Sequence, residues 1–156
     1  MAMTMNGEFQ LAAPREIVWQ KLNDAAVLKA CVPGCEELNK NSDTSFEAVA
    51  SIKIGPVKAR FKGKMELIDL DPPNGYRISG EGSGGITGFA KGAANVTLIE
   101  KDGGTLLTYT VEAKIGGKLA QLGQRLVNGA AKKIADEFFA NFAKIVNPPL
   151  EVGLPG

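Results

Sequence analysis

Both cysteines of the chain lie in one short segment, CVPGC, at Cys31 and Cys35. Two thiols so close together can form a redox pair or half of a metal site. A structural zinc site needs four Cys or His ligands, and the chain has no histidine to add to its two thiols. A thioredoxin-like motif has two residues between its cysteines and leads into a helix, whereas here three intervene and the polar segment EELNKN follows. We therefore interpret CVPGC as a structural corner, where Cys31 ends a helix and Pro33 and Gly34 stop it, with a regulatory disulfide as the alternative.

The absence of histidine also limits the catalytic chemistry that this chain can perform. It excludes Ser-His-Asp and Cys-His catalysis and removes the usual general base near neutral pH. The acidic residues of the middle of the chain are scattered over predicted turns and outer strand faces: Glu66, Asp69, Asp71, Glu81 and Glu112. We therefore predict no catalytic residue, no metal ligand and no cofactor.

The segment GEGSGG matches the dinucleotide-binding pattern G-x-G-x-x-G at Gly80, Gly82 and Gly85. That pattern holds a pyrophosphate only where a strand leads into a helix N-terminus. Here an alternating segment, ITGFAKGAANVTL, follows and predicts another strand. We interpret the match as coincidental and the glycines as a strand bend or a lip.

Composition places the chain among globular proteins. It has 156 residues, 44% of them hydrophobic, and a net charge of +1, which fits one domain with a sizeable core and gives no sign of nucleic-acid binding. The N-terminal MAMTMNGEF lacks the apolar region of a secretion signal, and no run of about 18 apolar residues occurs. We expect a cytoplasmic protein with reduced thiols, in which any membrane contact is peripheral, at the inner face.

Hydrophobic periodicity predicts a first strand, two short helices and then several strands. NGEFQLA alternates as a strand, PREIVWQKLND begins a helix at its proline, and AAVLKAC forms a second short helix. TSFEAVASIKI, GPVKARFKGKMEL, GYRISGEG, GFAKGAANVTLIE and TLLTYTVEAKI follow as strands. The turn segments DPPNG and KDGG make neighbouring strands antiparallel, which gives a sheet of about seven strands.

One long helix is predicted from about residue 117 to residue 146. Its apolar residues recur at spacings of three and four: Leu119, Leu122, Leu126, Ala130, Ile134, Phe138, Phe142 and Ile145. The expected architecture is α+β, a curved antiparallel sheet around the long C-terminal helix. We expect one ligand-binding domain over residues 1–146 and a short Pro-containing tail over residues 147–156.

The predicted inner face of the sheet carries many small residues. Alanine and glycine facing a helix either let it approach closely or leave space, and the helix itself supplies large side chains. We therefore predict a mostly apolar cavity lined by Phe46, Ala48, Ala50, Ala59, Phe61, Met65, Ala94, Val96, Tyr109, Val111, Leu126, Phe138 and Phe142. The alternative is that Leu126, Phe138 and Phe142 fill the space.

A basic stripe occupies the other face of one predicted strand, at Lys58, Arg60, Lys62 and Lys64. Solvated charges on an outer face are the default interpretation. A docking surface for an acidic partner or for anionic lipid is the alternative hypothesis.

The order and spacing of four segments resemble the CoxG family, the G subunits of carbon monoxide dehydrogenase, within the START-like (SRPBCC) superfamily. These segments are PREIVWQKLND, ACVPGCEEL, GPVKARFKGKMEL with the following DLDPP, and GFAKGAANVTL. The resemblance covers about residues 5–146 and implies a helix-grip fold. It further implies a lipophilic ligand between helix and sheet. It also implies an association with molybdenum hydroxylases of the carbon monoxide dehydrogenase type and with their recruitment to the membrane.

Three functional hypotheses follow from these observations. The first is a non-enzymatic carrier of a quinone or other lipid that serves such an enzyme as an accessory protein. The second is a START-like cyclase or hydrolase acting on a hydrophobic substrate, with Tyr109 or a cavity water as the acid or base. The third is a protein-docking module without a working pocket.

Overall fold

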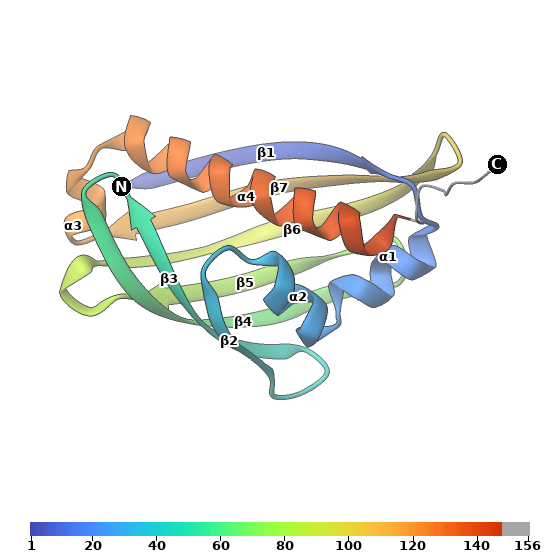
Figure 1. The fold of residues 1–156 in the computed structure, drawn as a ribbon, viewed down its shortest axis with the longest axis horizontal. Coiled ribbons are helices and arrows are strands. Elements are labelled where there is room, and N and C mark those ends of the chain that lie inside the picture. The colour runs from blue at the N-terminus through green and yellow to red at the C-terminus, as the bar shows by residue number, and fades with distance from the viewer. Residues whose placement is uncertain (148–156) are drawn as a thin grey trace.

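The structure is a computed structural model that describes residues 1–147. Its seven-stranded sheet is antiparallel throughout, in the order β1-β7-β6-β5-β4-β3-β2, and curves around a long C-terminal helix (Figure 1). The strands are β1 Ala2–Leu11, β2 Cys35–Lys40, β3 Ser45–Ile54, β4 Val57–Asp71, β5 Gly75–Ser83, β6 Phe89–Lys101 and β7 Gly104–Gly116. The helices are α1 Arg15–Leu22, α2 Ala25–Cys31, α3 Lys118–Gln121 and α4 Gln124–Val146, with a single 3₁₀ turn, η1, at Gly85–Thr87. The predicted helix-grip architecture is confirmed.

The alternation expected in the strands gives the sheet one apolar and one polar face. On β4, Ala59 and Leu67 are buried, while Lys58, Lys62 and Lys64 are exposed. Successive side chains of a strand point to opposite faces, so a period of two in the sequence becomes two different surfaces. The inner surface faces α4 and the outer surface faces solvent.

The segment between β1 and β2 carries the chain from one edge of the sheet to the other. Asp24 caps α2, since its Oδ1 accepts a hydrogen bond from the backbone N–H of Ala26 at 2.9 Å. The helix ends at Cys31, and Gly34 then adopts φ +72°, where a Cβ atom would lie 2.1 Å from the carbonyl oxygen of Ser51. Only glycine fits this close approach to β3, so the expected corner at Pro33 and Gly34 is confirmed.

The long C-terminal helix is interrupted, in contrast to the prediction of one helix from about residue 117. The backbone leaves the helix at Leu122 and Gly123, where Gly123 has φ +90°, and α4 begins at Gln124. This break resets the helical phase. The buried residues of α4 are Val127, Phe139, Phe142 and Val146.

Two members of the predicted apolar stripe lie outside the buried face of α4. Leu126 is 39% exposed and Ile145 is 40% exposed, whereas Phe139, which the stripe omitted, is buried. Neighbouring residues on an α-helix are separated by about 100°, so Val127 turns inward only by turning Leu126 away.

The core divides into two clusters at opposite ends of the sheet. The larger one lies beneath α1, α2 and the second half of α4, where Phe139 stacks on Phe9 and Tyr109 with ring centroids 4.5 and 5.4 Å apart. The smaller one joins Met3, Ile115, Leu119 and Val127 near α3. Apart from Asn147, the predicted tail at 147–156 lies outside the described residues.

Candidate ligand-binding cavity

An apolar cavity of about 400 Å³ lies between the sheet and the second half of α4. Its walls come from α4, from α1 and α2 with the corner that follows them, and from the inner face of all seven strands. The lining residues are Met5, Leu22, Leu28, Val32, Pro33, Leu38, Phe46, Met65, Leu67, Tyr76, Ile78, Val96, Leu107, Ala131, Ile134, Ala135, Phe138 and Phe139. Among these described residues, Tyr76 alone has a polar group on its side chain.

The chemistry of this lining favours an uncharged, lipophilic guest. Tyr76 is buried against Trp19, with ring centroids 5.3 Å apart, and burial raises the pKa of its hydroxyl. The hydroxyl therefore stays protonated at neutral pH and can act as a hydrogen-bond donor. An ionised group buried in this lining would lose its hydration without gaining a charged partner, so the carboxylate of a fatty acid would have to remain outside it.

The corner that contains the cysteines forms one wall of the cavity. Val32 and Pro33 both line it, and Nδ2 of Asn141 on α4 donates a hydrogen bond to the carbonyl oxygen of Cys31 at 3.1 Å. This bond ties the end of α2 to α4 and closes the space between them. The sequence identified the corner but not its role as a wall.

A second hollow of about 640 Å³ forms a groove between β3 and the first half of α4. Pro33 and Ile134 line both the groove and the inner cavity, so the two spaces adjoin at the corner. Gly129 lines the groove on α4, and a Cβ atom built there would have no neighbour within 4 Å. The helix and β3 thus stand apart along this groove.

The thirteen residues predicted to line a cavity fall into several environments. Phe46, Met65, Val96 and Phe138 line the inner cavity, and Leu126 lines the groove. Ala59, Tyr109 and Phe142 are buried in packed parts of the interior, and Ala48, Ala50 and Phe61 are half-buried on β3 and β4. Ala94 and Val111 line a further hollow of about 370 Å³, which shares Met65 and Ile78 with the inner cavity.

Several lining residues were missed because their segments gave no sign of facing the cavity. Leu22, Leu28 and Leu38 come from α1, α2 and β2, and Tyr76 and Ile78 come from β5. The period-two pattern of β5 places Tyr76 and Ile78 on one face, which is the signal that could have identified them.

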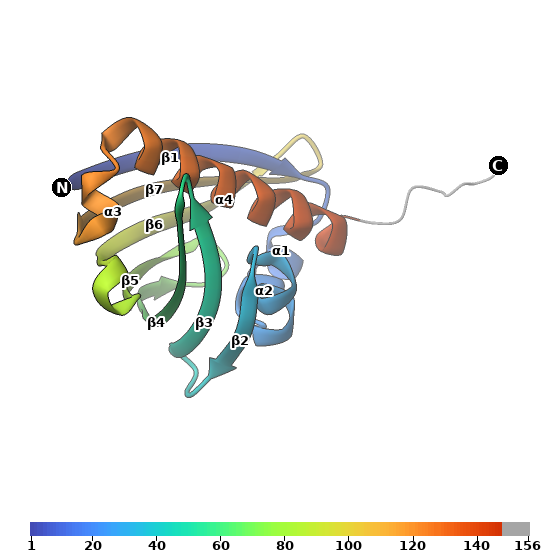
Figure 2. The ribbon, with the colours of Figure 1, turned by 60° about the vertical axis from the view of Figure 1, so that its left-hand side comes forward.

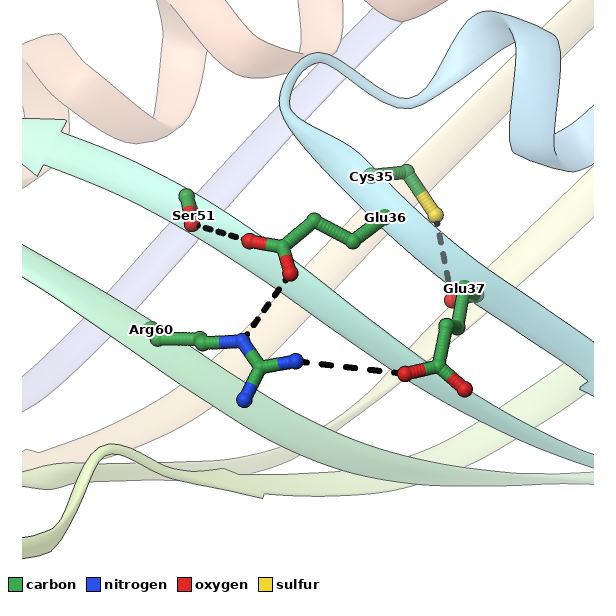
Figure 3. Close-up of polar contacts among 5 residues, drawn as sticks. All are labelled: Cys35, Glu36, Glu37, Ser51 and Arg60. Carbon is green, nitrogen blue, oxygen red and sulfur yellow. Dashed lines mark hydrogen bonds and ion pairs between the residues drawn. The ribbon is translucent and has the colours of Figure 1, made fainter.

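The predicted basic stripe lies on the exposed outer face of β4, but it is partly neutralised. Figure 3 shows Nε of Arg60 donating to Oε1 of Glu36 at 2.9 Å, with Glu37 3.9 Å from the same guanidinium. Lys64 pairs in register with Glu47 on one side and Glu81 on the other. Lys58 and Lys62 have no carboxylate directly opposite them on the neighbouring strands.

Both thiols lie in environments that suppress their reactivity. Cys31 is fully buried and Cys35 is half-buried, and both are free. Burial raises the pKa of each thiol, so both are protonated at neutral pH and poor nucleophiles. Within residues 1–147, no group of three or more His, Cys, Asp or Glu residues is placed to hold a metal ion.

The fold and the cavity define a START-like helix-grip protein, and comparison with solved structures agrees. The aromatase/cyclase Zhui from Streptomyces sp. R1128 has a TM-score of 0.68 at 12% identity, covering 94% of each chain. Ara h 8.0201 has a TM-score of 0.67 at 15% identity, covering 94% of this chain and 98% of its own. At these identities the likeness concerns the fold alone.

The family is defined by a sequence model. The model for the G subunit of carbon monoxide dehydrogenase (CoxG) matches residues 7–147, and the chain belongs to this family. A conserved protein from Geobacillus kaustophilus is similar over 92% of this chain and 95% of its own, with 34% identity and a TM-score of 0.86. A search of curated proteins gave no match. No helix in residues 1–147 is long and apolar enough to cross a membrane.

Proposed function

We propose that the protein is a non-enzymatic carrier that holds a lipophilic molecule, a quinone or another lipid, between α4 and the sheet. The observation that carries this proposal is the cavity of about 400 Å³, whose lining has one polar group, the hydroxyl of Tyr76, among the described residues. Ligand pockets in proteins generally fall between about 300 and 1,000 Å³ and are mostly apolar. Membership of the CoxG family and the START-like fold point in the same direction.

The partner that we propose is a molybdenum hydroxylase of the carbon monoxide dehydrogenase type. The support for it is the CoxG family, whose name refers to that enzyme. A redox enzyme that delivers electrons to a membrane pool needs a lipophilic acceptor such as a quinone. An accessory protein that carries this acceptor would work in the cytoplasm and at the inner face of the membrane.

The two other hypotheses have less support. The suggested acid or base, Tyr109, does not line the cavity. It is buried over Gly7 and stacks on Phe139. Burial raises the pKa of its hydroxyl. A docking module without a pocket would be expected to have a tightly packed interior rather than a cavity beside a groove.

Native mass spectrometry of the purified protein tests the carrier proposal directly. We expect co-purified lipophilic molecules, and saturable one-to-one binding of a short-chain ubiquinone analogue or of palmitate after solvent extraction. Binding should quench the fluorescence of Trp19, whose ring centroid lies 5.3 Å from that of the cavity residue Tyr76. A protein that retains nothing and binds neither probe would contradict the proposal, and turnover of a bound probe would favour the enzyme.

A further inference from the structure

The inner cavity is lined by one side chain with an unpaired hydrogen-bonding group, that of Tyr76 on β5. Tyr76 is 8% exposed, and its hydroxyl forms no hydrogen bond with any other residue in the range 1–147. Nε of Arg15 is the one side-chain nitrogen or oxygen in that range that is both fully enclosed and unpaired. The oxygen of Tyr76 is therefore not sealed in by its neighbours, and because Tyr76 lines the cavity, it borders the cavity space.

An unpaired hydroxyl in the interior is unusual. Buried polar groups in folded proteins nearly always have a hydrogen-bond partner, because a group without one has lost its hydration and gained nothing in return. A molecule bound in the cavity would supply the partner that the fold does not. The hydroxyl of Tyr76 thus carries information about the ligand.

The fold holds the ring of Tyr76 between a strand and a helix. Tyr76 pairs in register with Val96 on β6, and the ring of Trp19 on α1 lies 5.3 Å away between centroids, at an angle of 50°. Nη1 of Arg15 donates a hydrogen bond to Oδ1 of Asn74, which joins the start of α1 to the turn before β5. Figure 2 shows α1 and α2 beneath the second half of α4, where they cover this end of the sheet. The ring is therefore held in place, and the O–H bond is free to turn toward an acceptor.

The surroundings of the hydroxyl determine which chemical group can pair with it. Burial raises the pKa of Tyr76, so the group is an uncharged hydrogen-bond donor at neutral pH. The other described lining residues are aliphatic, aromatic or thioether side chains. A ligand carboxylate would be buried here without a cation, and a ligand hydroxyl would bring a hydrogen that needs an acceptor of its own. A carbonyl oxygen accepts the hydrogen bond, carries no charge and brings no donor.

We propose that Tyr76 determines the ligand specificity of the cavity by donating a hydrogen bond from its hydroxyl to a carbonyl oxygen of a neutral ligand. The ring carbonyl of a quinone and the carbonyl of an ester are two sources of this chemistry. The inference rests on the proposed function and narrows its ligand class, from lipophilic molecules in general to those that place a carbonyl group in the cavity. A free fatty acid keeps its carboxylate outside and makes no use of Tyr76.

A matched pair of probes, duroquinone and durene, tests the inference on the solvent-extracted full chain. Both have one six-membered ring with four methyl groups, and they differ in the two carbonyl oxygens of duroquinone. We expect the wild type to bind duroquinone more tightly than durene in equilibrium dialysis. Tyr76→Phe should weaken duroquinone binding about fivefold to tenfold, the effect of one neutral hydrogen bond, and should leave durene binding unchanged. Methyl palmitate is the ester probe, and a similar loss for either carbonyl probe supports the inference and identifies the source of the carbonyl.

Tyr109→Phe is the matched control variant. It removes the hydroxyl of the chain's other tyrosine, which is 7% exposed and lies outside the cavity lining. The affinity for every probe should be unchanged in this variant. Thermal unfolding adds a measurement without ligand, in which Tyr76→Phe should maintain or raise the melting temperature, because the hydroxyl that it removes has no partner in the fold. A clear decrease would mean that the hydroxyl has a structural partner and would contradict the inference.

The outcomes separate this inference from the carrier proposal. An equal loss of affinity for duroquinone and durene in Tyr76→Phe would show that the substitution acts through packing. Unchanged affinity for both duroquinone and methyl palmitate would show that neither uses the hydroxyl. Either result overturns the inference and leaves the carrier proposal in place, because the wild type still binds the probes. A wild type that binds no probe would contradict both.

Discussion

At the scale of single residues, the two thiols are packing groups. Cys31 is fully buried where α2 meets α4, and Cys35 donates from its Sγ to the carbonyl oxygen of Glu37 at 3.3 Å. Neither environment stabilises a thiolate, because burial is the main influence on both pKa values and raises them. The pair therefore has the character of small hydrophobic residues.

The double substitution Cys31→Ala/Cys35→Ala tests this interpretation. Removing two small buried groups should lower the free energy of unfolding by at most about 3 kcal/mol, less than most large-to-small core truncations. Ligand binding should be unchanged with or without reductant. Urea unfolding and a binding titration, each with and without dithiothreitol, provide the measurement. If the wild type had a reductant-sensitive activity that the variant lacks, the result would favour the alternative hypothesis of a regulatory disulfide.

A second prediction at this scale concerns Glu36 on the outer face. A hydrogen bond from the Ser51 hydroxyl and a second from Arg60 lower the pKa of Glu36 below its ordinary value of 4.5. Because the folded-state pKa lies below the unfolded one, this group stabilises the fold above pH 4.5, and the contribution disappears as pH falls through the folded-state pKa.

We expect Ser51→Ala to raise the pKa of Glu36, as followed by NMR titration of its carboxyl carbon. Glu66 is the internal control, because hydrogen bonds from Ser45 and Thr44 lower its pKa and Ser51 is not among their donors. An unchanged titration of Glu36 would show that the interaction with Arg60, and not the hydrogen bond from Ser51, lowers the pKa of Glu36.

At the scale of elements, two glycines test the break before α4: Gly123 lies in the break and Gly129 lies inside the helix. Gly123 has φ +90°, whereas Gly129 lies inside α4, and a Cβ atom has no neighbour within 4 Å at either position. The two sites therefore differ in backbone conformation and not in space.

Alanine at these two positions should have opposite effects on stability. Gly129→Ala should raise the free energy of unfolding by about 0.5–1 kcal/mol, because alanine is the better helix former. Gly123→Ala should lower it by about 1 kcal/mol, because a side chain is strained at positive φ. Thermal unfolding of both variants measures the difference. Stabilisation by both substitutions would mean that the break at Gly123 is not maintained in solution.

At the scale of the whole molecule, the sheet and α4 enclose space instead of packing fully against each other. Ala135 on α4 lines the cavity, whereas Ala13 is buried in the larger core cluster and lies outside the lining. Larger residues substituted at these two positions can therefore distinguish a cavity from a packed core.

We expect Ala135→Leu to maintain or raise the melting temperature of the ligand-free protein, because added apolar area is buried at about 25 cal/mol per Å². Its affinity for the quinone or palmitate probe should fall, since the side chain takes the ligand's volume. Ala13→Leu should instead cost about 1–3 kcal/mol by overpacking. Equal destabilisation by both, measured by thermal unfolding, would indicate a filled interior and contradict the carrier proposal.

The features that depend on neighbouring residues could be predicted from the sequence. The period-two pattern predicted the long strands, the turn segments predicted their antiparallel order, and Pro33 and Gly34 predicted the corner after α2. These signals are local, since a strand or a turn is specified by residues a few positions apart. Together with the family resemblance, they were sufficient for the architecture.

The residues that surround the cavity emerged only when the elements were packed together. The inward face of α4 includes Phe139 beside Phe138, and the corner at Val32 and Pro33 became a cavity wall through its contact with α4. Packing between distant segments has no periodic signature in the chain, because it depends on where each element lies after the others have folded around it.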